Sequence, residues 1–259
     1  MTVDYDRRIA RAQELAAVYA ESAELLNFYC GLARIQSDIF DKLRSSSETD
    51  PRSLTRYFPS LLEFVERHAP ERLAQFARKQ LAGLHECEND REDILTAYWE
   101  GDRTAPLESQ FFARVLLQPF AESFVGRPIL AAPLNQAHAL GAICPFCGAK
   151  PVLAVLRGEG DGAKRSLICS LCSTEWLYRR VVCPNCGEED KDQLPIYISQ
   201  QSGYVNVSAC DTCRCYLKSV DLTKDGHAVP LVDEIATVAL NIWAEEHGYV
   251  KLETNLLGM

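Results

Sequence analysis

Residues 144–148 read Cys-Pro-Phe-Cys-Gly and residues 183–187 read Cys-Pro-Asn-Cys-Gly, so one pattern returns 39 residues later. A second Cys-x-x-Cys pair follows each copy, at residues 169–172 and 210–213. Two intervening residues let both sulfurs of a turn face one ion, and the flanking proline and glycine suit a tight turn with positive φ. Thiols spaced in this way form disulfide bridges, a redox centre or metal sites.

The distance between the pairs is typical of a four-thiolate ribbon. Twenty-one residues separate Cys147 from Cys169, and 23 separate Cys186 from Cys210, which is enough chain for a hairpin that returns the second turn to the first. An interleaved scheme would instead join the first pair of each repeat around one ion. The repeat favours the consecutive scheme, with one closed site per copy. The predicted metal ligands are Cys144, Cys147, Cys169, Cys172, Cys183, Cys186, Cys210 and Cys213.

Composition favours metal binding over the other uses of these thiols. The chain has 259 residues, 47% hydrophobic and 24% charged, and its first 22 residues lack the apolar core of a secretory signal. No stretch approaches the roughly 18 apolar residues of a membrane span. We therefore expect a cytoplasmic protein without membrane insertion, in which cysteines stay reduced. A thioredoxin-like dithiol, the main rival, would need a βαβ context that the sequence lacks.

The N-terminal half is predicted to be α-helical. Apolar residues recur at spacings of three and four from Arg8 to Leu43, and a stretch rich in cap and turn formers, residues 45–53, interrupts the pattern. Residues 1–127 therefore form a predicted bundle-like domain. Its shorter helices are expected over Leu61–Arg67, Pro70–Leu84, Asp90–Trp99 and Ala105–Phe124.

The pattern changes after residue 127. Residues 127–143 hold two prolines and few charges, as expected of a connecting segment that packs on a surface. Pro230–His247 later has a helical period, with Gly248 placed to end the helix. Between them, a period of two predicts short strands over Pro151–Arg157, Glu175–Val182, Pro195–Gln200, Tyr204–Ala209 and Tyr216–Leu222.

Together these elements predict an α+β multidomain fold. An N-terminal α-helical domain (1–127) precedes a first four-cysteine rubredoxin-like or zinc-ribbon module with its linker (128–182), a second such module (183–228) and a C-terminal helix (229–259). Small β modules bury little apolar area. A bound ion would therefore supply much of their folding energy, on the order of 10 kcal/mol per structural zinc.

Two groups of residues near the cysteine pairs have both a functional and a plainer interpretation. Cys215 lies two residues beyond the last predicted ligand. It is interpreted either as an accessory thiol or as a small side chain in a strand. Trp176 and Tyr178 stand beside the basic pair Arg179 and Arg180. If exposed, these side chains could contact a partner or a nucleic acid. The plainer interpretation is that the two aromatic rings cap a thin ribbon core.

No catalytic residue, cofactor-binding residue or enzymatic activity is predicted. Cys30 and Cys87 are interpreted as helix-core or surface thiols. Nucleotide-binding, hydrolase and metalloprotease motifs are absent from the sequence. His138 alone lies near the first cysteine pair, and no spacing suggests a metal or catalytic pair among His68, His85, His138, His227 and His247.

Four stretches of the second half resemble the formate dehydrogenase accessory protein family. Together they span residues 144–249, and the extra thiol at Cys215 departs from the family pattern. They read C-P-F-C-G-A-K-P from residue 144, R-S-L-I-C-S-L-C-S-T-E-W-L-Y-R-R-V-V-C-P-N-C-G from residue 165, A-C-D-T-C-R-C-Y-L-K-S-V-D from residue 209 and D-E-I-A-T-V-A-L-N-I-W-A-E-E-H-G-Y from residue 233.

The resemblance implies a cytoplasmic accessory protein with an α-helical domain and two rubredoxin-like modules. Such a protein would bind the formate dehydrogenase catalytic subunit and assist its maturation or activation, without catalysis of its own. The eight matched cysteines would hold two metal ions, iron or zinc. Four thiolates suit either metal, so the spacing does not choose between them.

Two further function classes stay open at this stage. A zinc-ribbon module of the transcription type would need a basic stripe to bind nucleic acid. The chain instead has a net charge of -9, and its basic residues between Cys144 and Cys215 are scattered among acids, so no nucleic-acid partner is expected. A rubredoxin-like electron carrier would require iron, because zinc has no redox chemistry. The oligomeric state does not follow from the sequence.

Overall fold

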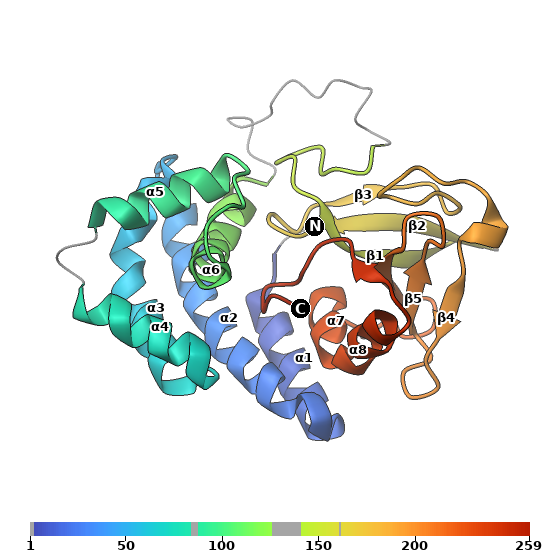
Figure 1. Ribbon diagram of the computed structural model, residues 1–259, viewed down its shortest axis with the longest axis horizontal. Coiled ribbons are helices and arrows are strands. Elements are labelled where there is room, and N and C mark those ends of the chain that lie inside the picture. Colours follow the sequence, from blue (N-terminus) through green and yellow to red (C-terminus); the bar gives the residue numbers. More distant parts are fainter. Residues whose placement is uncertain (1–2, 84–87, 126–140, 161) are drawn as a thin grey trace.

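Figure 1 shows the computed structural model of the protein. The structure describes residues 3–83, 88–125, 141–160 and 162–259. Most of the predicted connecting segment 127–143 lies outside these ranges, as do His85, Cys87 and His138.

The N-terminal half is helical, as predicted. Asp4 caps the first helix by accepting a hydrogen bond from the backbone N–H of Arg7. The elements are α1 (Tyr5–Val18), a 3-10 turn (Ala20–Ser22), α2 (Ala23–Arg44), a 3-10 helix (Pro51–Tyr57), α3 (Phe58–His68), α4 (Glu71–Ala82), α5 (Glu88–Trp99) and α6 (Leu107–Phe124).

The continuous helix predicted over Arg8–Leu43 is wrong, because the chain breaks between α1 and α2. Tyr19 leaves helical geometry, with φ −105° and ψ 90°, and the 3-10 turn lets the two helices pack side by side. Residues 19–22 contain neither glycine nor proline, so no local signal marks the break. The packing of Leu15 and Leu26 in one shared core accounts for it.

The second half forms one mixed sheet. Its order is β3-β2-β1-β6-β5-β4, and β7 pairs with β6. The β1–β6 and β6–β7 pairs are parallel, and the others are antiparallel. The β1–β6 pair joins the two predicted four-cysteine modules in one sheet. The strands are β1 (Pro151–Glu159), β2 (Gly162–Cys169), β3 (Glu175–Leu177), β4 (Ile196–Ile198), β5 (Val205–Ala209), β6 (Cys215–Asp221) and β7 (Val250–Lys251).

The final helix is split into α7 (Pro230–Ala236) and α8 (Val238–Glu246), which corrects the single helix predicted over Pro230–His247. Thr237 stands at the break, with φ −98° and ψ 42°. Gly248 has φ +76° and follows the end of α8, as predicted. Figure 1 shows α7 and α8 between α1 and the sheet, and α7 contacts α1, α2, β1 and β6.

The hydrophobic core is continuous from the helical half into the sheet. One buried cluster contains Leu32 of α2, Phe120 of α6, Leu167 of β2 and Val232 of α7. The structure therefore has the predicted α+β class, while the division of the chain into four domains stays a prediction. No described helix combines the length and apolar character that crossing a bilayer requires.

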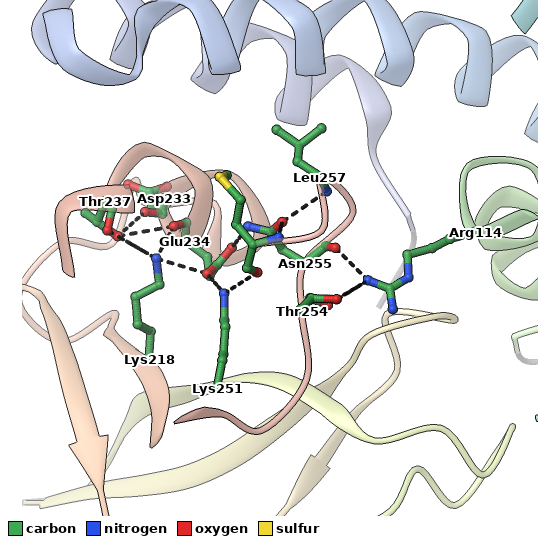
Figure 2. A network of polar contacts seen from close by, with 10 residues as sticks. Arg114, Lys218, Asp233, Glu234, Thr237, Lys251, Thr254, Asn255 and Leu257 are labelled. Carbon is green, nitrogen blue, oxygen red and sulfur yellow. Dashed lines mark hydrogen bonds and ion pairs between the residues drawn. The ribbon is translucent and has the colours of Figure 1, made fainter. Parts of the chain in front are cut away.

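Figure 2 shows a buried polar network where α7, the sheet and the C-terminal segment meet. Glu234, only 1% exposed, pairs with Lys218 at 2.9 Å and with Lys251. Its other carboxylate oxygen accepts a hydrogen bond from Asn255 Nδ2 at 2.6 Å. The Lys218 ammonium also donates to the carbonyl groups of Glu234 and Thr237 at the end of α7, where the helix dipole favours a cation.

The C-terminal segment also ties the network to the helical half. Arg114 of α6 donates hydrogen bonds to the carbonyl oxygens of Thr254 and Asn255, at 2.8 and 2.6 Å, and pairs with Glu253 at 2.8 Å. Three separated parts of the sequence thus meet through one set of charged contacts.

Candidate metal centres

The eight cysteines of the four Cys-x-x-Cys pairs form two clusters. Within each cluster, all four sulfur atoms lie within 4.8 Å of one another, and all are free thiols. The grouping follows the consecutive scheme, and each cluster could hold a metal ion. The first cluster is Cys144, Cys147, Cys169 and Cys172, and the second cluster is Cys183, Cys186, Cys210 and Cys213.

The sulfur separations suit a tetrahedral ion. A tetrahedron with metal–sulfur bonds of 2.3 Å places its sulfurs about 3.8 Å apart. In the first cluster, Cys144 and Cys172 are 3.5 Å apart and Cys147 and Cys169 are 3.3 Å apart. In the second cluster the Cys183–Cys213 and Cys186–Cys210 separations are both 3.7 Å. The geometry therefore fits zinc or iron, the ions that four thiolates prefer.

Hairpins bring the turns of each cluster together, as the spacing predicts. In the first cluster, β1 and β2 connect the Cys144 turn to the Cys169 turn, and in the second, β4 and β5 connect the Cys183 turn to the Cys210 turn. The two hairpins belong to one sheet, so the centres are held by a shared scaffold.

All four cysteine turns have the same backbone geometry. In each, the first cysteine N–H donates to the carbonyl group five residues later, at 2.8–3.0 Å, in the pairs Cys144–Ala149, Cys169–Thr174, Cys183–Glu188 and Cys210–Cys215. The residue after the second cysteine always has a positive φ. This residue is glycine in two turns and not in the others: Gly148 (75°), Ser173 (55°), Gly187 (79°) and Arg214 (56°).

Close contact of the sulfurs in the first cluster shifts the pKa values of Cys144 and Cys169 in opposite directions. Hydrogen bonding from Cys147 and its neighbours lowers the pKa of Cys144 below its usual value. Burial, reinforced by the neighbouring sulfurs, raises the pKa of Cys169. An ion bound in the cluster would displace the thiol protons, because metal ligands must be deprotonated.

The clusters differ in exposure. In the first, only Cys147 is partly exposed, whereas in the second Cys186 is exposed and Cys213 half-buried. The second centre therefore reaches the protein surface and the first lies mostly within the core.

Ser173 and Arg214 are structural positions of the cysteine turns that the sequence patterns did not identify. Each occupies the left-handed position that glycine takes in the other two turns, and alignment of the four turns would have marked both. Ser173 Oγ donates to Glu122 Oε1 of α6 at 2.5 Å. Arg214 pairs with Asp211 at 2.9 Å and donates to the His247 carbonyl group. Side-chain contacts thus hold each backbone in an unfavourable conformation.

The contact of Ser173 belongs to a buried charged group beside the first cluster. Glu122 also accepts from Tyr5 at 2.6 Å and pairs with Arg8 at 2.8 Å. Arg8 in turn donates to Ser173 Oγ at 3.2 Å. Burial and the Glu122 charge raise the pKa of Tyr5 well above its usual value. The first cluster is thereby linked to both α1 and α6.

Replacing Ser173 with alanine is expected to destabilise the protein more than replacing it with glycine. Both variants lose the hydrogen bond to the buried carboxylate, worth about 1.5–3 kcal/mol. Only glycine relieves the left-handed backbone, by about 1 kcal/mol. Urea unfolding of the two metal-loaded variants measures the difference. Equal stabilities would contradict the role assigned to the positive φ.

The aromatic residues near the first cluster are part of the core, which is the plainer of their two interpretations. Trp176 is buried and donates from Nε1 to the Gly141 carbonyl group at 3.0 Å. Tyr178 is also buried. Arg179 is exposed but pairs with Glu189 at 2.5 Å. The two rings therefore cap the core rather than present a surface to a partner.

The remaining cysteines and histidines lie outside both clusters in the described part of the chain. Cys215 is half-buried, and burial together with the neighbouring Cys213 raises the pKa of its thiol to about 11. Cys30 is a buried core thiol whose pKa is also raised by burial. No described histidine joins either group of sulfurs.

Comparison with known proteins agrees with the motifs. The family models "FdhE, central domain" and "FdhE, C-terminal domain" match residues 143–180 and 181–257. The "Protein FdhE homolog" of Aquifex aeolicus is 33% identical over 82% of this chain and 72% of its own length. That of Pectobacterium carotovorum is 27% identical over 97% of this chain and 86% of its own.

A solved structure extends the similarity to the whole fold. The crystal structure of the FdhE protein from Pseudomonas aeruginosa superposes with a TM-score of 0.69 at 25% identity, over 99% of this chain and 97% of that one. The helical half, which carried no sharp motif, is thus included in the similarity. The chain belongs to the FdhE family, the formate dehydrogenase accessory proteins that its cysteine motifs resemble.

Proposed function

We propose that this protein binds the catalytic subunit of a formate dehydrogenase in the cytoplasm and assists its maturation, without catalysing a reaction itself. The eight clustered cysteines are the ligands of two metal ions, iron or zinc. The observation that carries the proposal is the presence of two four-sulfur clusters on one sheet in a chain of the FdhE family.

The metal ions hold the surface that the partner meets. Each cluster closes the end of a hairpin, so an ion rigidifies turns that bury little apolar area by themselves. The second cluster reaches the surface at Cys186. The first is linked through Ser173 and Glu122 to α1 and α6. Loading of the centres thus supports a rigid arrangement of sheet and helices for docking.

Pairing of the arginines argues against the nucleic-acid alternative. A phosphate backbone is bound by basic side chains that are free to meet it. Three arginines of the sheet half instead pair with carboxylates of the same half: Arg157 with Glu175, Arg179 with Glu189 and Arg214 with Asp211.

A rubredoxin-like electron carrier is the second candidate, favoured by the exposure of Cys186. Electron transfer requires a redox-active ion close to the surface. Elemental analysis and voltammetry of protein purified without oxygen distinguish the electron carrier from the maturation factor. Iron with a reversible couple would support the carrier, and zinc alone would exclude it.

An anaerobic affinity purification from the native host tests the proposed partner. We expect the tagged protein to retain a formate dehydrogenase catalytic subunit, and the Cys147→Ser and Cys186→Ser variants to lose it. Mass spectrometry identifies the retained proteins. Cys215→Ser is the matched control, because it removes a thiol beside the second cluster that is not one of its four sulfurs.

Two results would contradict the proposal. Retention of the subunit by both cluster variants would separate partner binding from the metal centres. Recovery of nucleic acid or transcription proteins in place of the enzyme subunit would support the alternative function.

A further inference from the structure

A cavity of about 90 Å³ lies on the sheet beside the second cysteine cluster, of which Cys183 and Cys210 line it. Arg165 of β2, Asn206 of β5 and Ser219 of β6 line its floor. The neighbouring Lys218 points to α7 on the other side, so by strand alternation these residues face away from α7. The segment from Arg180 to Asn185, which joins the two modules, lines the cavity as well.

The volume restricts what the cavity can hold. One water molecule needs roughly 10–15 Å³ of cavity volume, and binding sites for drug-sized molecules have volumes of about 300–1,000 Å³. The cavity therefore suits several waters or one molecule of a few heavy atoms.

Arg165 places a buried positive charge in this cavity. The residue is 7% exposed. Its Nη1 donates to the carbonyl groups of Arg179, Arg180 and Val182, at 3.2, 3.4 and 3.1 Å. The guanidinium also lies over the Tyr178 ring, 5.6 Å from its centroid. Neither Nε nor Nη2 has a hydrogen-bond partner in the described part of the chain. A guanidinium stays protonated in proteins, and a buried charge without a counter-ion is unfavourable.

The described residues provide no carboxylate that pairs with this guanidinium. Among them, no aspartate or glutamate lines the cavity, whereas a second arginine, Arg180, does. Asp221 is the nearest acid in register on the same face of the sheet. Its Oδ1 already accepts from the N–H and Oγ1 of Thr223, at 3.0 and 2.6 Å. The two arginines therefore give this side of the cavity a positive charge that a bound anion could neutralise.

Neutral polar groups complete the lining. Asn206 is 6% exposed, and its Oδ1 has no hydrogen-bond partner among the described residues. The assignment of amide oxygen and nitrogen follows the network and can be reversed by a half-turn. The hydroxyl groups of Ser208 and Ser219 are 2.9 Å apart, so one donates to the other and the second retains a proton for a further acceptor.

The thiolates of the second cluster are the other possible source of negative charge for Arg165. Cys183 and Cys210 border the cavity, and four thiolates around a divalent ion carry net negative charge. No hydrogen bond joins Arg165 to a sulfur of the described chain. The thiolates act at longer range and leave the Nε–H and Nη2–H groups of Arg165 without a hydrogen bond.

We propose that this cavity is a binding site for a small, planar, monovalent oxyanion, a carboxylate of one or two carbons or an anion of the same shape. Two parallel N–H groups of Arg165 match two oxygen atoms of such an anion. The Asn206 amide and a serine hydroxyl supply further hydrogen bonds. This site is independent of the proposed partner, and it adjoins the second cluster at Cys183 and Cys210 without using their sulfurs as contacts.

Anion titration of the metal-loaded protein tests the site. Formate and nitrate are the planar probes, and sulfate and chloride are the controls for shape and charge. We expect saturable shifts of the Arg165 Nε–H signal in nitrogen-resolved NMR with the planar anions only. Arg165→Gln and Asn206→Asp should each weaken the affinity measured by calorimetry about tenfold or more, the second by placing a negative charge in the cavity.

Matched variants make the result decisive. Arg179→Gln removes a nearby arginine that does not line the cavity and should bind as the wild type does. Arg165→Lys keeps the charge but not the fork, and should lose the preference for planar anions even if Arg165→Gln does not fold. Equal responses to all four anions, or unchanged affinity in Asn206→Asp, would overturn the proposal. Partner retention in the affinity purification is a separate readout.

Discussion

Replacing Cys147 with serine is expected to remove the ion of the first cluster and to unfold its cysteine turns locally. Sγ of Cys147 lies 3.3 Å from Sγ of Cys169 and 3.5 Å from Sγ of Cys172, so it forms one corner of the cluster. A hydroxyl group is a poorer ligand than a thiolate for zinc or iron. The lost contribution is on the order of 10 kcal/mol for a structural ion in a small module.

Two measurements detect the loss of the ion and the local unfolding. Elemental analysis should give about half the metal content of the wild type, and hydrogen exchange should accelerate in the two turns of the first cluster. Cys215→Ser should keep the full metal content, because its sulfur belongs to neither cluster. Unchanged metal content in Cys147→Ser would refute the assignment of these cysteines as ligands.

Glu234→Gln is expected to destabilise the protein by about 3–5 kcal/mol at neutral pH. The substitution leaves the buried ammonium groups of Lys218 and Lys251 without their shared carboxylate. Lys218→Met should have a smaller effect, because Glu234 keeps Lys251 and Asn255. Urea unfolding of the metal-loaded proteins measures both changes. An equal or larger effect of Lys218→Met would show that Glu234 is not the centre of the network.

The contribution of Glu234 is also expected to depend on pH. Burial alone would raise its pKa, but the charges of Lys218 and Lys251 lower it to about 2 in the folded protein. Because the folded pKa lies below the unfolded value of 4.5, the stabilisation is fully present above pH 4.5 and is lost as the pH falls toward 2. Its size is about 3 kcal/mol.

The difference in stability between wild type and Glu234→Gln isolates this contribution. Both proteins lose metal on acidification, so that loss largely cancels in the comparison. The difference should shrink between pH 4.5 and pH 2. A difference that stays constant over this window would mean that Glu234 does not titrate as proposed.

Local sequence predicted the cysteine turns and most helices and strands, but it assigned no strand to the residues of β2 and β7. Cys-x-x-Cys needs only a short turn, and Gly148 and Gly187 adopt the positive φ that such a turn requires. The end of α8 at Gly248 follows the same reasoning. These features depend on residues within about five positions of one another, so their signals are contained in the sequence.

Helix breaks and buried charges were not predictable in this way. The break after Tyr19 and that at Thr237 lack a local breaker. In the sequence, Glu122 cannot be distinguished from an exposed polar residue near the end of a helix. Its partners Tyr5 and Arg8 are more than 110 residues away. Contacts between distant segments determine which polar residues are buried.

By itself, the sequence determined the two sets of four thiols, the division into a helical half and a half rich in strands, and the resemblance to the family. Tertiary structure alone decided that β1 and β6 pair and join both cysteine clusters in one sheet. It also placed Arg165 and Asn206 around one cavity. The physical reason is that turns are set by local backbone preferences, whereas strand pairing uses backbone hydrogen bonds that every residue except proline can make.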